Sequence, residues 1–517
     1  MIFRQFGCSG TGFNYHLYVA HYASKSIFLP VFRPCMFRWP NTAKTPSIGV
    51  NPRRHKPFMQ QPMSWRDHFR ATIVLSLPLI VGQVAMIAIW TADIIMLGWI
   101  STDALAAGIQ ANRLYQPFYF IALGLTIAVS PLAAQALGAG SRRQARRVIR
   151  QGIWLAILYG AISFVPMWYG ETLLLMLGQE ESIARDAAPF LKMLAPGMMP
   201  TFVYFALRNY ISAYKKPGPP VIVTMVGAAF NVAMNAILSK GLFGMPAMGM
   251  AGIGLATSLT FLFMAAALIH YMNTFRPFRY TRPFARFWRI DISIMKRLLV
   301  VGTPIAFTLV SETGMFIFAG LYIGIFGTYA VAASGIVNQI AAIVFMVPLA
   351  IGQASTIRVG HEAGAGRRQD TIRAGVTPVV LTISVCLVQS VLIIGFAEAS
   401  IRAFLNPDDA SIYAVVMLAM PMLMVVAFFQ VFDGLQVVLS CVLRGLNDTK
   451  IPAVISIMAY WGVGATMAVA LSTPLGFGPV GVWWGLLLGL VAGSIMLGWR
   501  GVLTYWRITR GKRLLMA

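Results

Sequence analysis

The stretch GTPIAFTLVSETGMFIFAGLYIGIFG (302–327), followed after a short break by IVNQIAAIVFMVPLAIGQASTIRVGHEAGAG (336–366), decides the fold of this chain. Its first part is apolar for longer than the roughly 20 residues with which one helix crosses the hydrocarbon core of a bilayer. That part contains one acidic residue, Glu312. An ionised carboxylate inside a bilayer is costly unless it is paired, hydrated or protonated. The stretch therefore predicts membrane-spanning helices, and it makes Glu312 a candidate for handling an ion or a substrate.

The composition extends this prediction to the whole chain. Of the 517 residues, 58% are hydrophobic and only 11% are charged, and the mean hydropathy is +0.72. This indicates a polytopic membrane protein. The formal net charge of +25 does not indicate a nucleic-acid partner, because the basic residues lie between apolar spans, as the positive-inside rule predicts. The four cysteines form neither a CxxC motif nor a ligand cluster, so we expect no disulfide framework and no metal site.

Hydropathy, together with Gly, Pro and charge at the breaks, predicts an all-α protein of twelve transmembrane helices. The connections after the odd-numbered helices carry at most two Lys or Arg each, whereas the other connections and the chain ends carry most of them. Both termini should therefore be cytoplasmic. The predicted helices cover residues 71–98, 108–137, 148–168, 186–211, 220–240, 249–272, 297–326, 331–358, 372–396, 410–442, 452–472 and 480–505.

Five segments follow from these helices. Residues 1–62 are basic, contain no acid and have no apolar core long enough for a signal peptide. We expect a disordered tail there, or an artefact of an early start codon, with a transit peptide as a further alternative. We assign 63–272 to an N-lobe, 273–296 to a cytoplasmic inter-lobe loop, 297–505 to a C-lobe, and 506–517 to a basic cytoplasmic tail.

The two lobes resemble each other when the chain is shifted by about 226 residues. Because six crossings return the chain to its starting side, both lobes should have the same orientation. Such parallel repeats are typical of transporters that move two lobes about a central site. The matching segments are ALAAGIQANR (104–113) with AVAASGIVNQ (330–339), LGAGSRRQ (137–144) with AGAGRRQ (363–369), and Pro78 with Pro304.

Three acidic residues lie within predicted spans, whereas nearly all others lie in loops or at helix ends. They are Asp93, Glu312 and Asp433. Each could exchange a proton or coordinate Na⁺ with other oxygens, or could be a structural carboxylate that a neighbouring helix satisfies. The repeat does not copy them, because Asp93 aligns with Ala319 and Glu312 aligns with Met86. The scaffold is thus predicted to be symmetric and its chemistry asymmetric. Glu312 and Asp433 lie in one half and could share one cavity, and we count Asp93 with them among the acids of the ion-coupling and substrate cavity.

Three further residues could support these acids. Asn231 and Asn235 are four residues apart and share a helix face, where they could complete a polar pocket with Asp93 or simply join helices by hydrogen bonds. Phe429 lies one turn before Asp433. Its ring could stack on a cationic guest, or it could be a packing residue.

Several motifs together resemble the multidrug and toxic compound extrusion (MATE) family, in its NorM-like branch, over residues 71–505. They are LPLIVGQ…DIIMLG (77–98), GTPIAF…SETGMF (302–316), VFMVPLAIGQASTIRVGHEAG (344–364) and DGLQVVLSCVLRGLNDTKIP (433–452). The resemblance implies a twelve-helix secondary antiporter that expels organic cations in exchange for Na⁺ or H⁺.

The resemblance also implies roles for single residues. Asp93 matches the family's helix-1 carboxylate, and Glu312 and Asp433 match two C-lobe carboxylates linked to cation binding. Asn231 matches a family Asn, whereas Asn235 stands where another branch has Asp. Phe429 stands where NorM-like members often have Tyr.

We therefore expect a monomeric multidrug antiporter in a bacterial inner membrane, surrounded by lipid, without a cofactor and with organic cations as substrates. A lipid-linked oligosaccharide flippase of related fold is an alternative, but it would need several cationic residues in its cavity to hold a pyrophosphate. The sequence offers three carboxylates and almost no Lys or Arg in the middle of a span. A membrane-embedded enzyme is a second alternative, but it would need a catalytic His, Cys or metal constellation, which we do not find in the spans.

Overall fold

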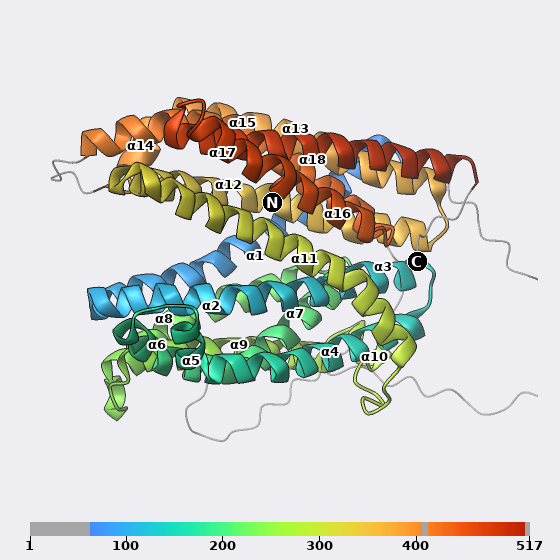
Figure 1. The fold of residues 1–517 in the computed structure, drawn as a ribbon. Coiled ribbons are helices and arrows are strands. Elements are labelled where there is room, and N and C mark those ends of the chain that lie inside the picture. Colours follow the sequence, from blue (N-terminus) through green and yellow to red (C-terminus); the bar gives the residue numbers. More distant parts are fainter. Residues whose placement is uncertain (1–62, 406–411, 512–517) are drawn as a thin grey trace, which may run out of the picture. The chain divides into compact units, whose positions relative to one another are not determined.

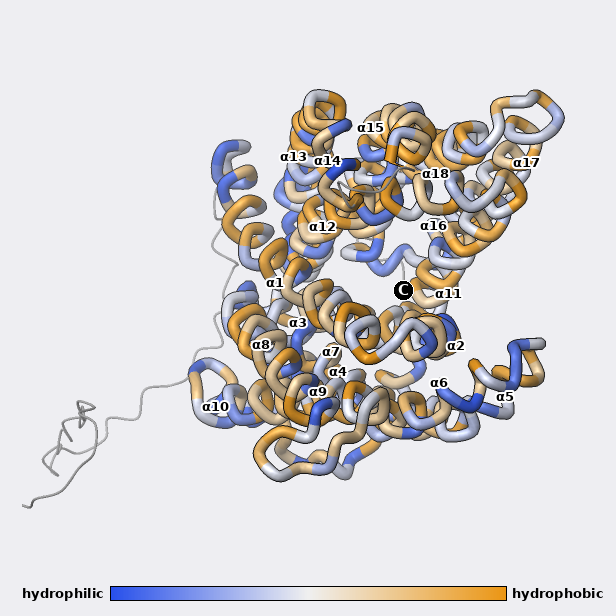
Figure 2. Tube along the Cα trace, turned by 90° about the vertical axis from the view of Figure 1, so that its left-hand side faces the viewer, coloured by the Kyte–Doolittle hydropathy of each residue, from blue (hydrophilic) through white to orange (hydrophobic). Residues whose placement is uncertain are grey.

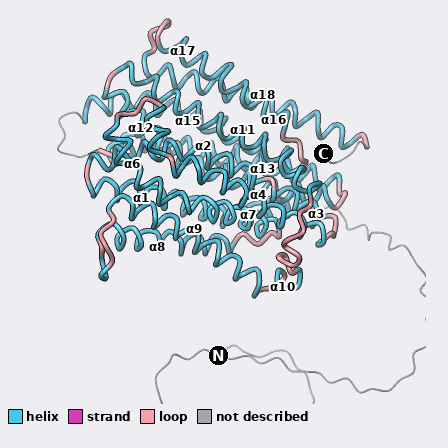
Figure 3. The backbone as a smooth tube through the Cα atoms, turned by 60° about the horizontal axis from the view of Figure 1, so that its bottom comes forward, coloured by secondary structure: helices cyan, strands magenta, loops and turns pink. Residues whose placement is uncertain are grey.

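The computed structural model describes residues 63–405 and 412–511. Over these residues the regular structure is entirely helical, and Figure 3 shows helices and loops without strands. Twelve helical stretches are long and apolar enough to cross a membrane, so the predicted all-α polytopic fold is confirmed. The predicted tail at 1–62, and residues 512–517 of the predicted basic tail, lie outside the described residues.

The first six spans form what we name the N-terminal half, and the last six form the C-terminal half (Figure 1). The short elements α5 (Gly170–Met176), η2 (Leu242–Gly244), α10 (Phe278–Thr281) and α14 (Ala397–Arg402) lie in the connections. The spans are α1 (Trp65–Ile100), α2 with α3 (Thr102–Ile127, Val129–Gly138), α4 (Arg142–Trp168), α6 with η1 and α7 (Glu181–Leu194, Ala195–Gly197, Met198–Ala213), α8 (Gly218–Lys240), α9 (Gly249–Thr274), α11 with η3 (Ile292–Ile323, Gly324–Phe326), α12 (Thr328–Gly364), α13 (Arg368–Gly395), α15 (Ile412–Gly445), α16 with η4 and α17 (Lys450–Ile457, Met458–Ala465, Thr466–Ser472), and α18 (Gly478–Thr509).

Each half has its own apolar interior, and large apolar side chains also cover the outside. Tyr204 and Phe261 are fully buried in the N-terminal half, and Phe429 and Trp483 are buried in the C-terminal half. In Figure 2 hydrophobic residues cover most of the helices, whereas hydrophilic residues gather at connections such as those around α10 and α14. This arrangement suits helices whose outer faces contact lipid, because lipid chains do not penalise exposed apolar side chains.

The first helix of each half crosses to the other half. In Figure 1, α11 runs diagonally from the helices of the N-terminal half to those of the C-terminal half. Its beginning packs closely on α2, since a Cβ added to Gly302 would lie 2.9 Å from the Cα of Leu125. In the same way, α1 begins against α12 and α13 and continues against α8.

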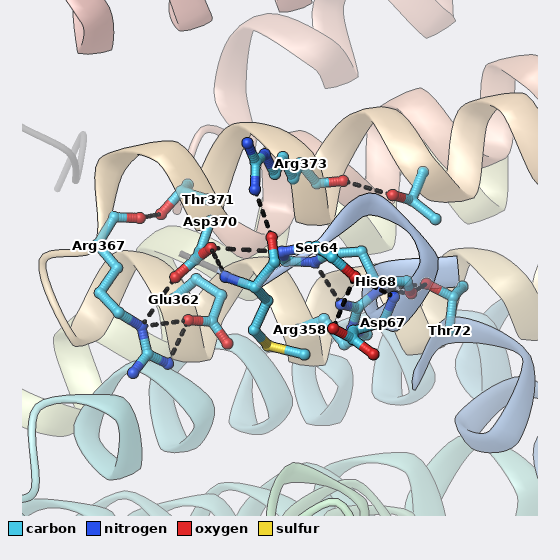
Figure 4. Close-up of polar contacts among 12 residues, drawn as sticks. Ser64, Asp67, His68, Thr72, Arg358, Glu362, Arg367, Asp370, Thr371 and Arg373 are labelled. Carbon is cyan, nitrogen blue, oxygen red and sulfur yellow. Dashed lines mark hydrogen bonds and ion pairs between the residues drawn. The ribbon is translucent and has the colours of Figure 1, made fainter. Parts of the chain in front are cut away.

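A buried polar cluster holds the start of α1 against the C-terminal half (Figure 4). The Arg358 guanidinium donates to the backbone carbonyl oxygen of His68 at 2.7 Å, and it also contacts Nδ1 of the His68 imidazole at 2.6 Å. On its other side the His68 ring lies 3.4 Å from Asp370, which also accepts the Met63 amide at 3.0 Å. The His68 side chain is fully buried, so these partners fix the entry of α1.

The turns and loops at residues 139–141, 214–217, 275–291, 365–367 and 446–449 define what we name the basic face. The loop 275–291 is held against α4, because Arg150 donates to the carbonyl oxygens of Ala285 and Arg286 at 3.0 and 2.9 Å. Trp154 donates to the Phe287 carbonyl at 2.9 Å and stacks on the Phe287 ring. The connection between the halves is therefore bound along the N-terminal half.

At the basic face, the ends of α3 and α12 cross in a way that follows the repeat. A Cβ added to Gly364 would lie 2.8 Å from the carbonyl carbon of Gln135 and still closer to its oxygen. A Cβ added to Gly138 would meet the His361 carbonyl group in the same manner. Gly138 with Gly364, and Gln135 with His361, are each 226 residues apart. The main chains of the two halves thus touch through a pair of equivalent glycines.

Side chains complete this contact, again in a reciprocal way. Gln135 of α3 donates to the Gly445 carbonyl at the end of α15, at 2.8 Å. His361 of α12 lies 2.7 Å from the Ala213 carbonyl at the end of α7. Asn447 adds a 2.8 Å hydrogen bond to the amide oxygen of Gln135. Each half therefore binds a helix end of the other half, and the basic face is closed between them.

Candidate functional site

A cavity of about 690 Å³ lies between the two halves. This volume suits a drug-sized molecule, since ligand pockets usually measure about 300–1,000 Å³. Its walls come from α1, α2 and α7 on one side and from α11, α12 and α15 on the other. Its polar and aromatic lining includes Gln83, Asn112, Arg113, Gln116, Tyr119, Arg208, Asn209, Glu312, Phe316, Asn338, Gln353, Phe429, Asp433 and Arg444.

Two of the three predicted acids share the wall formed by the C-terminal half. Glu312 comes from the middle of α11 and Asp433 from the middle of α15, and the two carboxyls are close enough to interact electrostatically. Asp433 is 7% exposed and Glu312 is partly buried. Arg444 lies near enough to Glu312 to attract it. The expectation that Glu312 and Asp433 share one cavity agrees with this geometry.

A π-helical turn brings a tyrosine to Glu312 that sequence reasoning missed. The segment η4 packs on α11, and Trp461 donates to the Ser311 hydroxyl at 2.9 Å. The neighbouring Tyr460 is buried and lies near enough to Glu312 to interact with it electrostatically. The only signal in the sequence was a tyrosine within an apolar span. Single π-helical segments often occur at functional sites, but hydropathy does not predict them.

Phe429 lies in a packed aromatic cluster beside the cavity. Its ring meets Phe316 at 6.2 Å and Trp483 at 5.9 Å between centroids, both edge to face, and it is 1% exposed. These contacts are those of a packing residue. A stacking role toward a cationic guest stays a prediction.

Asp93 differs from the other two acids, and here the expected shared cavity needs a correction. Asp93 does not belong to the lining of the 690 Å³ cavity. Its side chain turns from α1 toward α8 and α9, where Asn235 donates to Oδ1 and Thr257 donates to Oδ2, each at 2.7 Å. Asn231 joins the network through Asn235 at 3.2 Å and Thr257 at 3.3 Å. The donors on these helices satisfy the carboxylate away from the cavity.

This network contains both asparagines predicted beside Asp93, and it adds Thr257. All four side chains are at most 4% exposed. The amide oxygen of Asn235 is buried and has no hydrogen-bond partner within the described residues. Two carboxylate oxygens, an unsatisfied amide oxygen and a hydroxyl are the ligands that a hard cation such as Na⁺ accepts. Thr257 escaped sequence reasoning because a threonine in an apolar span usually bonds its own helix.

The arginines of the cavity require a second correction. The sequence has almost no Lys or Arg in the middle of a span, which predicted a cavity with few cationic residues, but Arg113, Arg208 and Arg444 all line the cavity. The prediction ended the tenth helix at 442, whereas α15 continues to Gly445 and includes Arg444. Arg208 and Arg444 stand near helix ends, and long arginine side chains place their charge away from their own Cα. The charge of this cavity is therefore mixed.

The comparison with protein families reproduces the internal repeat. A family model described as MatE matches residues 78–237 and again residues 304–470. The two matches begin at Pro78 and Pro304, the pair that the 226-residue shift aligned. Together they cover more than half of the chain.

Curated relatives and solved structures agree with this match. The chain is 39% identical over 445 residues to a "Probable multidrug resistance protein NorM" of Mesorhizobium japonicum, covering 86% of this chain and 94% of that one. It is 35% identical to a protein of the same description from Rhizobium meliloti, covering 85% and 94%. The crystal structure of the eukaryotic MATE transporter AtDTX14 has a TM-score of 0.77 at 21% identity, covering 87% and 99%. A MOP superfamily transporter from Pyrococcus furiosus has a TM-score of 0.77 at 17% identity, covering 87% and 100%.

The two structural neighbours share the fold, and the relatives above 30% identity carry the assignment. The resemblance seen in the sequence motifs is thereby confirmed, and the enzyme alternative is excluded. The chain belongs to the MatE family of multi-pass membrane transporters.

Proposed function

We propose that this protein exports lipophilic organic cations and other drugs across a bacterial inner membrane, in exchange for Na⁺ or H⁺. The observation that carries the proposal is the pair Glu312 and Asp433 on one wall of a drug-sized cavity between the halves. The relatives described as multidrug resistance proteins support the same reading.

The coupling step follows from the closeness of the two carboxylates. Two ionised carboxylates in one apolar site repel each other, so binding of a proton or of Na⁺ relieves the repulsion. A cationic drug satisfies the same charge, and drug and ion therefore compete for Glu312 and Asp433. Tyr460 lies beside Glu312, where its hydroxyl is a candidate donor to the carboxylate. The network around Asp93 is a second candidate ion site, remote from the drug.

Alternating access requires the closed basic face to open. Because most of the Lys and Arg that the structure describes outside the spans lie there, we propose that the basic face is cytoplasmic, which also places both chain termini in the cytoplasm. The structure then corresponds to a state closed toward the cytoplasm. Opening requires the contacts of Gly138 and Gly364 with the other half to separate.

The test is efflux of a fluorescent organic cation from cells that lack their own pumps. The variants are Glu312→Gln and Asp433→Asn, and Asp103→Asn, which alters an exposed acid at the start of α2, is the matched control. At equal expression, wild type and the control should lower dye accumulation, and the two cavity variants should fail. Steps of Na⁺ or pH then identify the coupling ion.

Two outcomes would contradict the proposal. If wild type moves no dye, export of organic cations is wrong, and movement of lipid-linked sugars becomes the activity to assay. If Glu312→Gln and Asp433→Asn export as well as wild type, the carboxylates do not couple transport.

A further inference from the structure

The two walls of the cavity carry different charges. Among the described residues that line it, the C-terminal half contributes Glu312, Asp433 and Arg444. The N-terminal half contributes Arg113 and Arg208 and no acid. A simple receptor for cations would not need positive charge on the wall that faces its carboxylates. The distribution instead suits a molecule with a positive and a negative end.

Arg208 is the buried cation of this wall. Its side chain is on α7, it is 7% exposed, and it donates through Nη2 to the amide oxygen of Gln83 on α1. Gln83 is neutral, and Arg208 is in none of the ion pairs found among the described residues. In the fourth span of the other half, Arg444 has Glu312 as an acidic neighbour. The position that the repeat aligns with Glu312 is Met86, which also lines the cavity but carries no charge.

A buried guanidinium with only a neutral partner is stabilised when an anion reaches it. Burying a charge is costly unless an opposite charge accompanies it. Arginine presents a planar fork of donors that matches a carboxylate in bidentate geometry. Arg208 therefore offers to a carboxylate in the cavity an interaction that a plain cation cannot use.

We infer that Arg208 is a specificity-determining residue that binds the carboxylate of zwitterionic substrates while Glu312 and Asp433 receive their cationic end. The inference rests on the proposed export function and narrows its substrate class. Molecules that combine a carboxylate with an amine or a delocalised cation should be preferred over permanent cations of the same size. The cation is attracted to one wall but is repelled by Arg208.

The experiment uses two dyes that differ only in the anionic group. Rhodamine B carries a carboxylate and a delocalised cation, and its ethyl ester keeps the cation but lacks the carboxylate. Binding of each dye to the purified full chain is measured by fluorescence polarisation, and export is measured in proteoliposomes. Wild type is compared with Arg208→Gln, with Arg208→Lys, and with the control Arg185→Gln, whose arginine is exposed on α6 and pairs with Glu181.

We expect Arg208→Gln to weaken binding of rhodamine B by about tenfold or more, since hydrogen bonds to charged groups contribute that much. Binding of the ester should stay equal or become tighter. Arg208→Lys keeps the charge and a donor for Gln83 but loses the planar fork, so its affinity for rhodamine B should be intermediate. Arg185→Gln should match wild type for both dyes.

Three results would overturn the inference. An equal loss for both dyes in Arg208→Gln, with Arg208→Lys restoring both, would make Arg208 a structural residue. Unchanged binding of both dyes would remove it from the site. If wild type binds and exports neither dye, the proposed export of organic cations fails together with the inference. If wild type exports the ester but Arg208→Gln leaves the binding and export of rhodamine B unchanged, the inference alone is refuted.

Discussion

Replacing Gly364 by alanine should shift the protein away from the state closed at the basic face. The added methyl group would lie 2.8 Å from the carbonyl carbon of Gln135 and closer to its oxygen, whereas ordinary contact begins near 3.4 Å. The obstructing atoms are main chain of α3, so no side chain can rotate away. The helices α3 and α12 must therefore separate.

Two effects of opposite sign decide the magnitude. Alanine favours a helix over glycine by about 1 kcal/mol, and it does so whether the halves touch or not. Overpacking a close contact costs about 1–3 kcal/mol, and this applies only while the halves touch. The helix preference of alanine therefore cancels between the closed state and a state separated at this face. The substitution changes the free-energy difference between these two states only by the cost of overpacking the contact. It should shift that equilibrium by about 5- to 150-fold toward separation.

Spin labels on the basic face can measure this shift. Cysteines placed at the exposed positions Arg143 of α4 and Gln369 of α13 report the distance between the halves by pulsed electron paramagnetic resonance. Gly364→Ala should increase the population of long distances. Gly335→Ala is the matched control, because it lies in the same helix α12 and its Cβ would meet nothing within 4 Å. A folded Gly364→Ala variant with an unchanged distance distribution would refute the closing role of this contact.

Two further substitutions test local parts of the structure by thermal unfolding of the purified protein. Asp291→Ala should cost about 1–2 kcal/mol, because Asp291 caps α11 and binds Arg147 at 2.7 Å, whereas Asp291→Asn keeps the cap and should cost less. Burial raises the pKa of Asp291, but the hydrogen bond and charge of Arg147 together with the backbone hydrogen bonds at the start of α11 outweigh burial and lower that pKa below 3.8. This stabilisation should therefore be present at neutral pH and disappear as the pH falls below about 4. Thr257→Val should cost about 1–3 kcal/mol by removing a donor from Asp93. Thr260→Val is its control, because Thr260 bonds only its own helix, and equal losses for both would contradict the reasoning.

Hydropathy predicted the number and order of the helices because few backbone conformations are stable inside a bilayer. Every buried N–H and C=O group must be satisfied within the span, so an apolar stretch of sufficient length becomes a helix. Glu312 and Asp433 could be identified from the sequence because an acidic residue within such an apolar stretch is rare. The helix ends were less accurate, and α15 continues past its predicted end to include Arg444.

The direction of side chains could not be predicted from spacing. Asp93 was expected in the shared cavity, but whether a residue of α1 faces the cavity or faces α8 and α9 depends on how the helix is rotated in the bundle. Tyr460 reaches Glu312 from a π-helical turn, which changes the register of every following side chain. Arg208 stands near the end of its helix, and its spacing in the sequence does not show that its side chain lines the cavity.

The internal repeat is preserved more closely in the main chain than in the positions of the charged residues. One isosteric substitution can test the function of this difference in charge between the two halves. The contact between Arg208 and Gln83 contains a guanidinium and a neutral amide of nearly the same shape as a carboxylate. Gln83→Glu should turn this contact into an ion pair with little change in packing. Arg208 would then have an acidic neighbour, as Arg444 already has in Glu312. Because the new carboxylate would compensate the charge of Arg208, Arg208 should attract a substrate carboxylate less strongly.

The Gln83→Glu variant should therefore lose its preference for rhodamine B over the ethyl ester by about tenfold, through weaker binding of the zwitterion and tighter binding of the cation. Its control is Gln369→Glu, which adds the same charge at an exposed position of α13 that does not line the cavity. The preference of Gln369→Glu should remain that of wild type. If Gln83→Glu keeps the preference of wild type, the two walls of the cavity do not divide the positive and negative ends of the substrate between them.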